Sequence, residues 1–182
     1  MKIGIAGVGG IGSNVAVHLV RSGIRQLKLV DFDRVEHSNL NRQFYFADQV
    51  GSPKCRMLAA NLRRIAPDLE LECLQLELDA GNAARVFEDC GIVVEGLDLC
   101  DAKKMLWEAA TAPGRPVISA SGVAGRAMDD IRVRPLGHGF VVGDFATDAD
   151  DGELYSPKIA AIAAMMADLV LRKAEEHDPN PI

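Results

Sequence analysis

A glycine-rich turn separates the first apolar run of this chain from its first amphipathic stretch. Residues 2–6 lead directly into Gly7-Val8-Gly9-Gly10-Ile11-Gly12-Ser13, and a helical pattern covers residues 11–22. Between a strand and a helix, this spacing predicts a turn that binds the phosphates of a nucleotide. Gly7 permits the tight turn, Gly9 lets phosphates approach the backbone, and Gly12 lets the helix pack against the strand. The alternative is a turn that serves packing alone.

The rest of the chain alternates apolar runs with amphipathic stretches, which predicts parallel strands joined by right-handed helical crossovers. The fold class expected is therefore α/β, a Rossmann-like, doubly wound and mostly parallel sheet with a short antiparallel extension. We expect strands at residues 2–6, 27–32, 69–76, 92–97 and 116–120, and helices at 11–22, 53–65, 80–88 and 102–112.

The pattern changes after residue 120. Short β-like runs cover residues 131–135 and 139–142, and a last helix runs from Ser156 to about Lys173. We expect one nucleotide-binding domain over residues 1–182, with its core at 1–120 and the extension at 121–182. Between the last β-like run and the helix, residues 143–152 predict a solvated acidic loop that carries Asp144, Asp148, Asp150 and Asp151.

Composition excludes several classes of protein. The 182 residues are 48% hydrophobic, which suffices for a core, and 26 acidic against 20 basic residues give a net charge of −6, which disfavours a nucleic-acid partner. No apolar run reaches the ~20 residues of a membrane span and the first residues carry no leader pattern, so we expect a cytoplasmic protein without a membrane partner. The four cysteines (Cys55, Cys73, Cys90 and Cys100) form no C-x-x-C pair, so neither zinc nor a disulfide framework is expected.

Polar residues after the second strand indicate which nucleotide is bound. Asp31 ends that strand, 24 positions after Gly7, where an acid can bind ribose hydroxyls. In a helical turn capped by Ser38, Asn39 and Arg42 share a face, and the guanidinium offers a fork for phosphate oxygens. A triphosphate has more use for such a cation than a dinucleotide has. Taken alone, Arg42 is better explained as a member of a surface ion pair.

Two further charged residues occupy informative positions. Ser52 is expected to cap a helix whose first position is Pro53, which places Lys54 in the first turn, where a cation opposes the helix dipole unless an anion shares the site. Lys54 could also be an exposed lysine that tolerates this penalty. Asp98 follows an apolar strand, at the sheet edge where ligands bind, and can hold Mg²⁺ or cap the next helix.

Together, G-x-G-G-x-G-S, D-x-D-x-V-x-x-S-N-L-N-R-Q, G-x-P-K and the strand-end Asp resemble the enzymes that adenylate ubiquitin-like proteins. The chain is most similar to the bacterial ThiF/MoeB/HesA branch, and its late motif Tyr155-Ser156-Pro157-Lys158-Ile159-Ala160, which spans the start of the last helix, resembles a compact ThiF subgroup of thiamine biosynthesis. The resemblance implies adenylation of the C-terminal glycine carboxylate of a small ubiquitin-like sulfur-carrier protein, with ATP and Mg²⁺, by a homodimer.

The resemblance also implies roles for individual residues. Arg42, Lys54 and Asp98 are the expected catalytic residues, with Lys54 stabilising charge at the α-phosphate and Asp98 coordinating Mg²⁺. The loop at residues 144–152 lies where the family crosses over the tail of the carrier. The expected nucleotide-binding residues are Gly7, Gly9, Gly10, Gly12, Asp31, Asp33, Ser38, Asn39, Arg42, Gln43 and Lys54.

Departures from the family pattern leave alternatives open. Leu99 stands where the family has Asn, Lys103 stands at an Arg position, and the last cysteine, Cys100, is too early for the family's thioester or persulfide chemistry. An N-terminal helix whose Arg reaches the neighbouring subunit is missing or supplied elsewhere. The alternatives are a catalytically degenerate partner that binds ATP and carrier, and an NAD-dependent dehydrogenase. Relatives that adenylate a modified tRNA base share these motifs, but the net charge weighs against that substrate.

Overall fold

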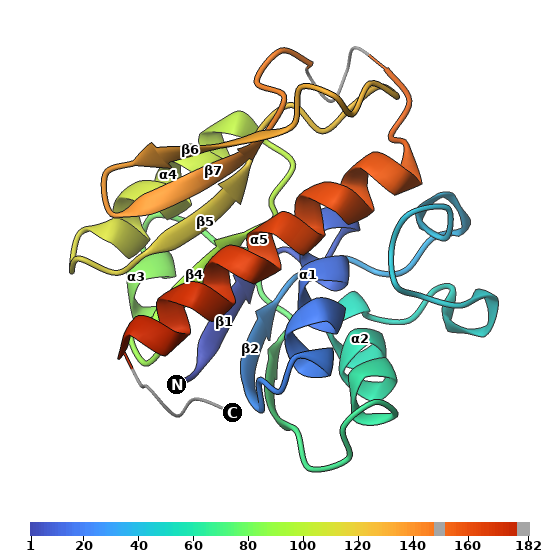
Figure 1. Cartoon of the computed structure of the whole chain (residues 1–182). Coiled ribbons are helices and arrows are strands. Elements are labelled where there is room, and N and C mark those ends of the chain that lie inside the picture. The colour runs from blue at the N-terminus through green and yellow to red at the C-terminus, as the bar shows by residue number, and fades with distance from the viewer. Residues whose placement is uncertain (148–151, 178–182) are drawn as a thin grey trace.

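The computed structural model describes residues 1–147 and 152–177, which form a seven-stranded sheet with helices on both faces (Figure 1). The strand order is β3-β2-β1-β4-β5-β7-β6, and every neighbouring pair is parallel except β6 and β7. This confirms the predicted parallel sheet with a short antiparallel extension. The strands are β1 (Ile3–Ala6), β2 (Gln26–Val30), β3 (Glu70–Leu74), β4 (Ile92–Glu95), β5 (Val117–Ala120), β6 (Arg132–Leu136) and β7 (Gly139–Gly143).

The helices divide between the two faces of the sheet. Helices α1 (Gly10–Arg21), α2 (Lys54–Arg63) and α5 (Ser156–His177) share one apolar core, and α3 (Ala83–Val86) and α4 (Cys100–Thr111) share the other. Strand β1 shows why both faces need cover: Ile3 and Ile5 enter the first core, and Ala6 enters the second. Side chains of a strand alternate between faces, so a strand without polar positions is stable only between two helical layers.

The topology brings three loops to one edge of the sheet. The chain leaves β1 for β2 on one side and later returns to β4 on the other, so β1 lies at the point where the strand order reverses. Loops that follow parallel strands at such a point enclose a crevice at the carboxyl edge. The glycine turn after β1, the segment after β2 and the loop after β4 all begin there.

The predicted and observed bounds of the helices differ by a few residues at several ends, and α5 runs to His177 rather than to about Lys173. Contacts explain the differences at α3 and α2. The helix expected at residues 80–88 is a single turn, α3, because Asp79 accepts the backbone amides of Gly81 and Asn82 and holds the chain there in a turn. Helix α2 begins at Lys54 rather than at Pro53, because Pro53 pairs with Arg34 in an antiparallel bridge.

The predicted solvated acidic loop is wrong at its start: Gly143 ends β7, and the first acid, Asp144, is buried. Asp144 is only 9% exposed and forms a 2.6 Å ion pair with Lys158, whose side chain is fully buried. The other three acids, Asp148, Asp150 and Asp151, lie outside the described residues. In the described part of the chain, no helix is long and apolar enough to cross a membrane.

Candidate functional site

The glycines of the first turn have different structural roles. Gly7 has φ +79°, and a Cβ there would lie 2.6 Å from the carbonyl oxygen of Gly96. A Cβ on Gly12 would overlap the carbonyl oxygen of Gly7, so the close contact between α1 and the turn requires glycine. Next to Gly9 the space is open, with only the amide nitrogen of Gln43 within 4 Å. Gly9 therefore leaves access to the first turn of α1, whose unpaired amides attract anions.

Alanine substitutions at two of these glycines should separate packing from ligand access. We expect Gly12→Ala to lower the free energy of unfolding by about 1–3 kcal/mol, because backbone must move to admit the methyl group. Gly9→Ala should leave the free energy of unfolding near wild type but weaken ATP binding by about tenfold, the cost of about one charge-assisted hydrogen bond. Urea unfolding and calorimetry measure the two effects; a Gly12→Ala variant as stable as wild type would contradict the packing role.

Asp31 joins the glycine turn to the segment that follows β2. One carboxylate oxygen accepts the amide of Val8 at 2.7 Å and the other accepts the amide of Asp33 at 2.8 Å. Burial raises the pKa of Asp31 above its ordinary value, although these two amides and Lys54 oppose the shift. Each oxygen keeps a further lone pair, so the carboxylate can still accept a hydroxyl such as those of ribose.

Lys54 is buried and paired. Its backbone amide donates to the carbonyl of Asp33 at 2.9 Å, and its ammonium lies 2.8 Å from the carboxylate of Asp33. Its residue exposure is 6%, which rules out the exposed lysine considered above. The ion pair offsets the unfavourable position of a cation at a helix N-terminus. Glycine turn, Asp31, Asp33 and Lys54 thus form one continuous network.

The segment with Arg42 and Gln43 is attached to α1 by side chains of that helix. The amide of Asn14 donates to the carbonyl of Arg42 at 2.9 Å, and the hydroxyl of Ser13 accepts the backbone amide of Phe44 at 3.0 Å. The side chain of Arg42 consequently passes Gly10, with its Cδ 3.7 Å from where a Cβ of Gly10 would be. The structure brings Arg42 to the glycine turn from a separate part of the chain.

Gln43 carries a polar atom that fits a ligand at this turn. Its residue is 9% exposed, its amide group lies beside Gly9, and its Oε1 is buried without a hydrogen-bond partner. An unpaired buried polar atom is costly, and the cost disappears when a ligand supplies the missing partner. The residues present therefore fit a polar, phosphate-bearing molecule.

The turn before Arg42 is built differently from the prediction. A 3₁₀ turn covers His37–Asn39, and Asn39 accepts the backbone amide of Glu36 at 3.0 Å. Ser38 is exposed and makes no cap: its hydroxyl donates to Glu36, and its carbonyl accepts the guanidinium of Arg42 at 2.9 Å. Asn39 is 7% exposed and supports the backbone rather than sharing an open face with Arg42.

Asp98 stands apart from this network. It is exposed in the loop between β4 and α4, and no hydrogen bond or ion pair joins it to another predicted site residue in the described chain. The residue before α4 is Leu99, so the helix-cap alternative for Asp98 is wrong. Gly96, two positions earlier, contacts Gly7 closely and places the loop beside the turn.

A magnesium ion at Asp98 would need ligands from the substrate. No group of three or more His, Cys, Asp or Glu side chains in the described residues could hold a metal ion by itself. An exposed carboxylate next to a phosphate site still fits Mg²⁺, which takes one or two carboxylates together with phosphate oxygens and water.

Several residues that shape this edge were not predicted from the sequence. Ser13 stands in the glycine motif, but nothing in the sequence indicated that its hydroxyl accepts the backbone amide of Phe44. The hydroxyl of Tyr45 donates to the carbonyl of Val8 at 2.8 Å, which was not predicted either. Glu95 is the charged residue in an otherwise apolar strand, a signal that could have revealed its buried ion pair with Lys103. Asn14 gave no signal in the sequence.

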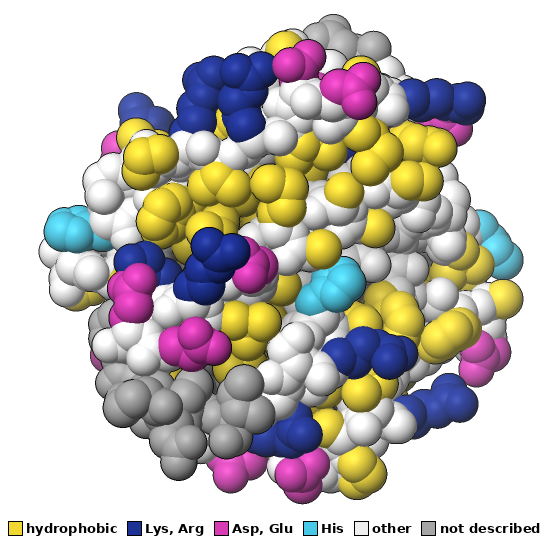
Figure 2. Space-filling view, viewed as in Figure 1, with side chains coloured by type: hydrophobic (Ala, Val, Ile, Leu, Met, Phe, Trp, Pro, Cys, Tyr) yellow, Lys and Arg dark blue, Asp and Glu magenta, His cyan; other side chains and the backbone are white. Residues whose placement is uncertain are grey.

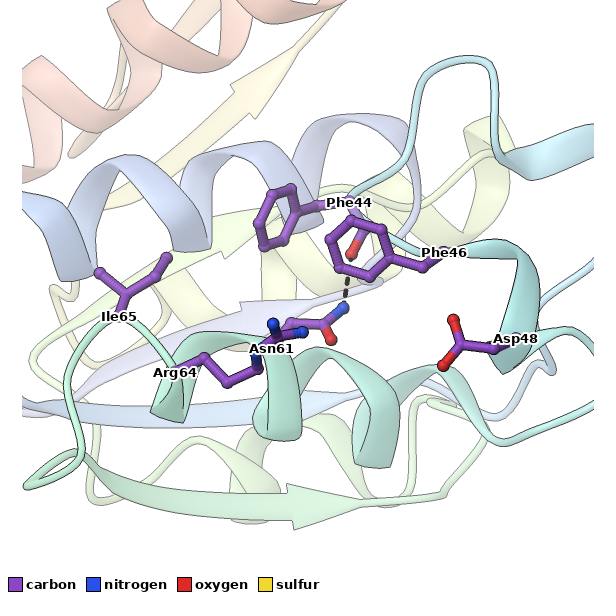
Figure 3. Close-up of a pocket in the computed structure, with 6 residues that line it drawn as sticks. All are labelled: Phe44, Phe46, Asp48, Asn61, Arg64 and Ile65. Carbon is purple, nitrogen blue, oxygen red and sulfur yellow. Dashed lines mark hydrogen bonds between the residues drawn. The ribbon is translucent and has the colours of Figure 1, made fainter.

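A shallow cavity of about 520 Å³ lies between α2 and the segment that follows Gln43 (Figure 3). Its lining contains none of the predicted nucleotide residues. Asn61 donates to the carbonyl of Phe44 at 3.0 Å and exchanges hydrogen bonds with Gln49, which fixes the segment from this side. The lining residues are Phe44, Phe46, Asp48, Asn61, Arg64 and Ile65.

Comparison with known proteins agrees with this architecture. The model of the ThiF family matches residues 1–182. The chain is 33% identical to tRNA threonylcarbamoyladenosine dehydratase 2 of Saccharomyces cerevisiae over 97% of its own length, and 31% identical to the sulfur carrier protein adenylyltransferase of Thermus thermophilus over 63%. It spans 39% and 42% of these relatives.

A solved structure shares the fold. The ATP complex of the E. coli tRNA N6-threonylcarbamoyladenosine dehydratase, TcdA, superimposes with a TM-score of 0.81 at 21% identity, over 96% of this chain and 88% of that one. Since the family model matches the whole sequence, the chain belongs to the ThiF family.

Proposed function

We propose that this protein is an ATP-dependent adenylyltransferase. The observation that carries the proposal is that two cations from separate segments belong to the glycine turn: Arg42 passes it at Gly10, and Lys54 is linked to it through Asp33 and Asp31. A dinucleotide is bound through a pyrophosphate that the turn alone can hold, whereas a triphosphate needs additional positive charge. In the described residues nothing resembles a hydride-transfer site, so the dehydrogenase alternative has no support beyond the turn.

In the proposed mechanism the free amides at the start of α1 bind phosphate oxygens and Asp31 binds the ribose. Lys54 shifts from Asp33 toward the α-phosphate, and the guanidinium of Arg42 binds oxygens of the departing pyrophosphate. An oxygen of the acceptor carboxylate attacks the α-phosphorus and forms a new oxygen–phosphorus bond. The bond from the α-phosphorus to the α,β-bridging oxygen breaks, and pyrophosphate leaves with that electron pair. Mg²⁺, held by Asp98, would neutralise phosphate charge. Positioning and electrostatics suffice for this step, without a protein nucleophile.

The acceptor we propose is the C-terminal glycine carboxylate of a small ubiquitin-like sulfur carrier, in thiamine biosynthesis, with the enzyme acting as a homodimer. Surface charge supports a protein over a nucleic acid. On the face in Figure 2, described Lys and Arg side chains alternate with Asp and Glu and form no continuous basic surface. Near β6, Arg126 pairs with Glu153 and Arg132 pairs with Asp130.

A modified tRNA base is the second candidate acceptor. The yeast relative aligned over 97% of this chain is a tRNA threonylcarbamoyladenosine dehydratase, and the threonine part of that base carries a carboxylate. The predicted absence of a nucleic-acid partner therefore needs a direct test.

The test is ATP–pyrophosphate exchange with MgATP and labelled pyrophosphate, with a panel of sulfur carriers ending in Gly-Gly in one arm and unfractionated tRNA in the other. We expect exchange that depends on a carrier and is lost when the carrier lacks its last glycine. Exchange that requires tRNA and not a carrier would show that the acceptor is the modified tRNA base. Binding of ATP and carrier without exchange would indicate a degenerate partner, and calorimetry showing binding of NAD in preference to ATP would overturn the proposal.

A further inference from the structure

Glu95, the last residue of β4, carries a fully buried carboxylate at the edge of the sheet. It accepts the backbone amide of Leu97 at 2.6 Å, the hydroxyl of Ser119 on β5, and the ammonium of Lys103 on α4 at 3.0 and 3.1 Å. A buried charge persists only when it is paired and hydrogen-bonded, and all three kinds of donor are directed to this one group. The carboxylate therefore joins a loop, a helix and a strand.

Lys103 faces this carboxylate rather than the open site. An ammonium has three N–H groups, and three acceptors surround it: both oxygens of Glu95 and the carbonyl of Ala120 at 3.3 Å. No N–H remains to bind a phosphate. Although Lys is not equivalent to Arg at a bidentate site, here its ammonium reaches both carboxylate oxygens from the first turns of α4.

The loop that this cluster holds is the loop of Asp98. Leu97, immediately before Asp98, is fixed by its amide, and α4, which begins two residues after Asp98, is fixed through Lys103. Asp98 itself has no partner in the described chain, so its place depends on these neighbours. A ligand supported on both sides is preorganised, and groups that support metal ligands strongly affect metal affinity.

We propose that Glu95, Lys103 and Ser119 are positioning residues that hold Asp98 ready for the magnesium ion of MgATP. This inference rests on the proposed role of Asp98 in the function above. In this proposal Lys103 does not touch the nucleotide or the ion, because its ammonium is occupied by Glu95 and Ala120. It supports magnesium binding only by fixing the loop that carries Asp98.

The experiment measures ATP affinity by calorimetry with Mg²⁺ and with EDTA, in the wild type, Asp98→Asn, Lys103→Met, Lys103→Arg, Ser119→Ala and the double variant Asp98→Asn/Lys103→Met. In the wild type, Mg²⁺ should tighten ATP binding. Lys103→Met should reduce this gain by about 10-fold or more, as changes to groups behind metal ligands do, while affinity in EDTA stays within about twofold of wild type. Lys103→Arg should restore most of the gain.

The double variant distinguishes positioning from a general structural role. If Lys103 acts through Asp98, the double variant should show the same Mg²⁺-dependent gain as Asp98→Asn alone, because nothing remains to be positioned. Should Lys103→Met fold poorly, Ser119→Ala, which removes one hydrogen bond and keeps the ion pair, should still lower the gain. A gain that survives Lys103→Met or Ser119→Ala overturns the inference, as does an equal loss of affinity with and without Mg²⁺.

The wild-type arm decides the proposed function separately. If the wild type binds ATP but gains nothing from Mg²⁺, the role of Asp98 and this inference are both wrong, whereas ATP binding stands. If the wild type binds no ATP, the proposed function fails before any variant is considered.

Discussion

Replacing Lys54 by alanine is expected to lower the rate of ATP–pyrophosphate exchange by about 10²–10³-fold, or about 2.7–4 kcal/mol of transition-state stabilisation. The ammonium is held inside the site by Asp33, 2.8 Å away, where little water screens its charge. A preorganised cation in such a place stabilises charge that develops at the α-phosphate far better than a mobile surface lysine does.

The fold should tolerate this substitution, because Asp33 has a side chain 43% exposed and can be solvated once Lys54 is gone. Lys104→Ala is the matched control: Lys104 is exposed on α4 and its loss should leave exchange within about twofold of wild type. Thermal unfolding should show both variants folded. Exchange by Lys54→Ala comparable to that of Lys104→Ala would remove Lys54 from the mechanism.

Replacing Lys158 by methionine is expected to destabilise the protein by about 3–5 kcal/mol, because it leaves the carboxylate of Asp144 buried without its counter-ion. Lys158 has no exposed surface, lies 2.6 Å from that carboxylate and also donates to the carbonyl of Ala124. These contacts join the start of α5 to the chain segments that follow β5 and β7. Urea unfolding measures the loss.

Arg172→Met is the control on the same helix. Arg172 pairs with Asp168 at 2.8 Å, but the two side chains are 70% and 54% exposed, and such a surface pair contributes at most about 1 kcal/mol. Adding Asp144→Asn to Lys158→Met should recover part of the lost stability, since it removes the unpaired charge. Equal destabilisation by the two single variants would refute the importance of the buried pair.

The same pair predicts a direction for the pH dependence of stability. Burial raises the pKa of Asp144, but hydrogen bonds from Lys158 and from the amides of Ala146 and Thr147 outweigh it, and the pKa is lowered below its ordinary value of 3.8. A carboxylate with a lowered folded-state pKa stabilises the fold above its unfolded pKa, and this contribution disappears as the pH falls below about 4. Lys158→Met should therefore unfold with a weaker acid dependence than the wild type.

The pattern of the sequence determined the sheet and most of the elements that surround it. Apolar runs without polar positions require cover on both faces, and the glycine spacing after the first run allows few geometries, so both features are local and readable. Errors arose where side chains bind backbone over short distances. Asp79 accepts backbone amides and so shortens the helix at α3, and Asn39 accepts the backbone amide of Glu36, so that Glu36 rather than Ser38 precedes the 3₁₀ turn. Such competition between side-chain and backbone partners has no periodicity to reveal it.

Charged residues show the clearest division between sequence and structure. Position in the sequence was enough to nominate Arg42, Lys54 and Asp98, because the ends of parallel strands and the starts of helices meet at one edge. Only the tertiary structure decided which charges are buried and with what partner: Lys54 with Asp33, Glu95 with Lys103, and Asp144 with Lys158. Each pair joins separate elements, and its energy depends on desolvation by residues distant in the chain. A local pattern could at most have marked Glu95 as a charge within an apolar strand, and it could not have given the partner of any of these residues.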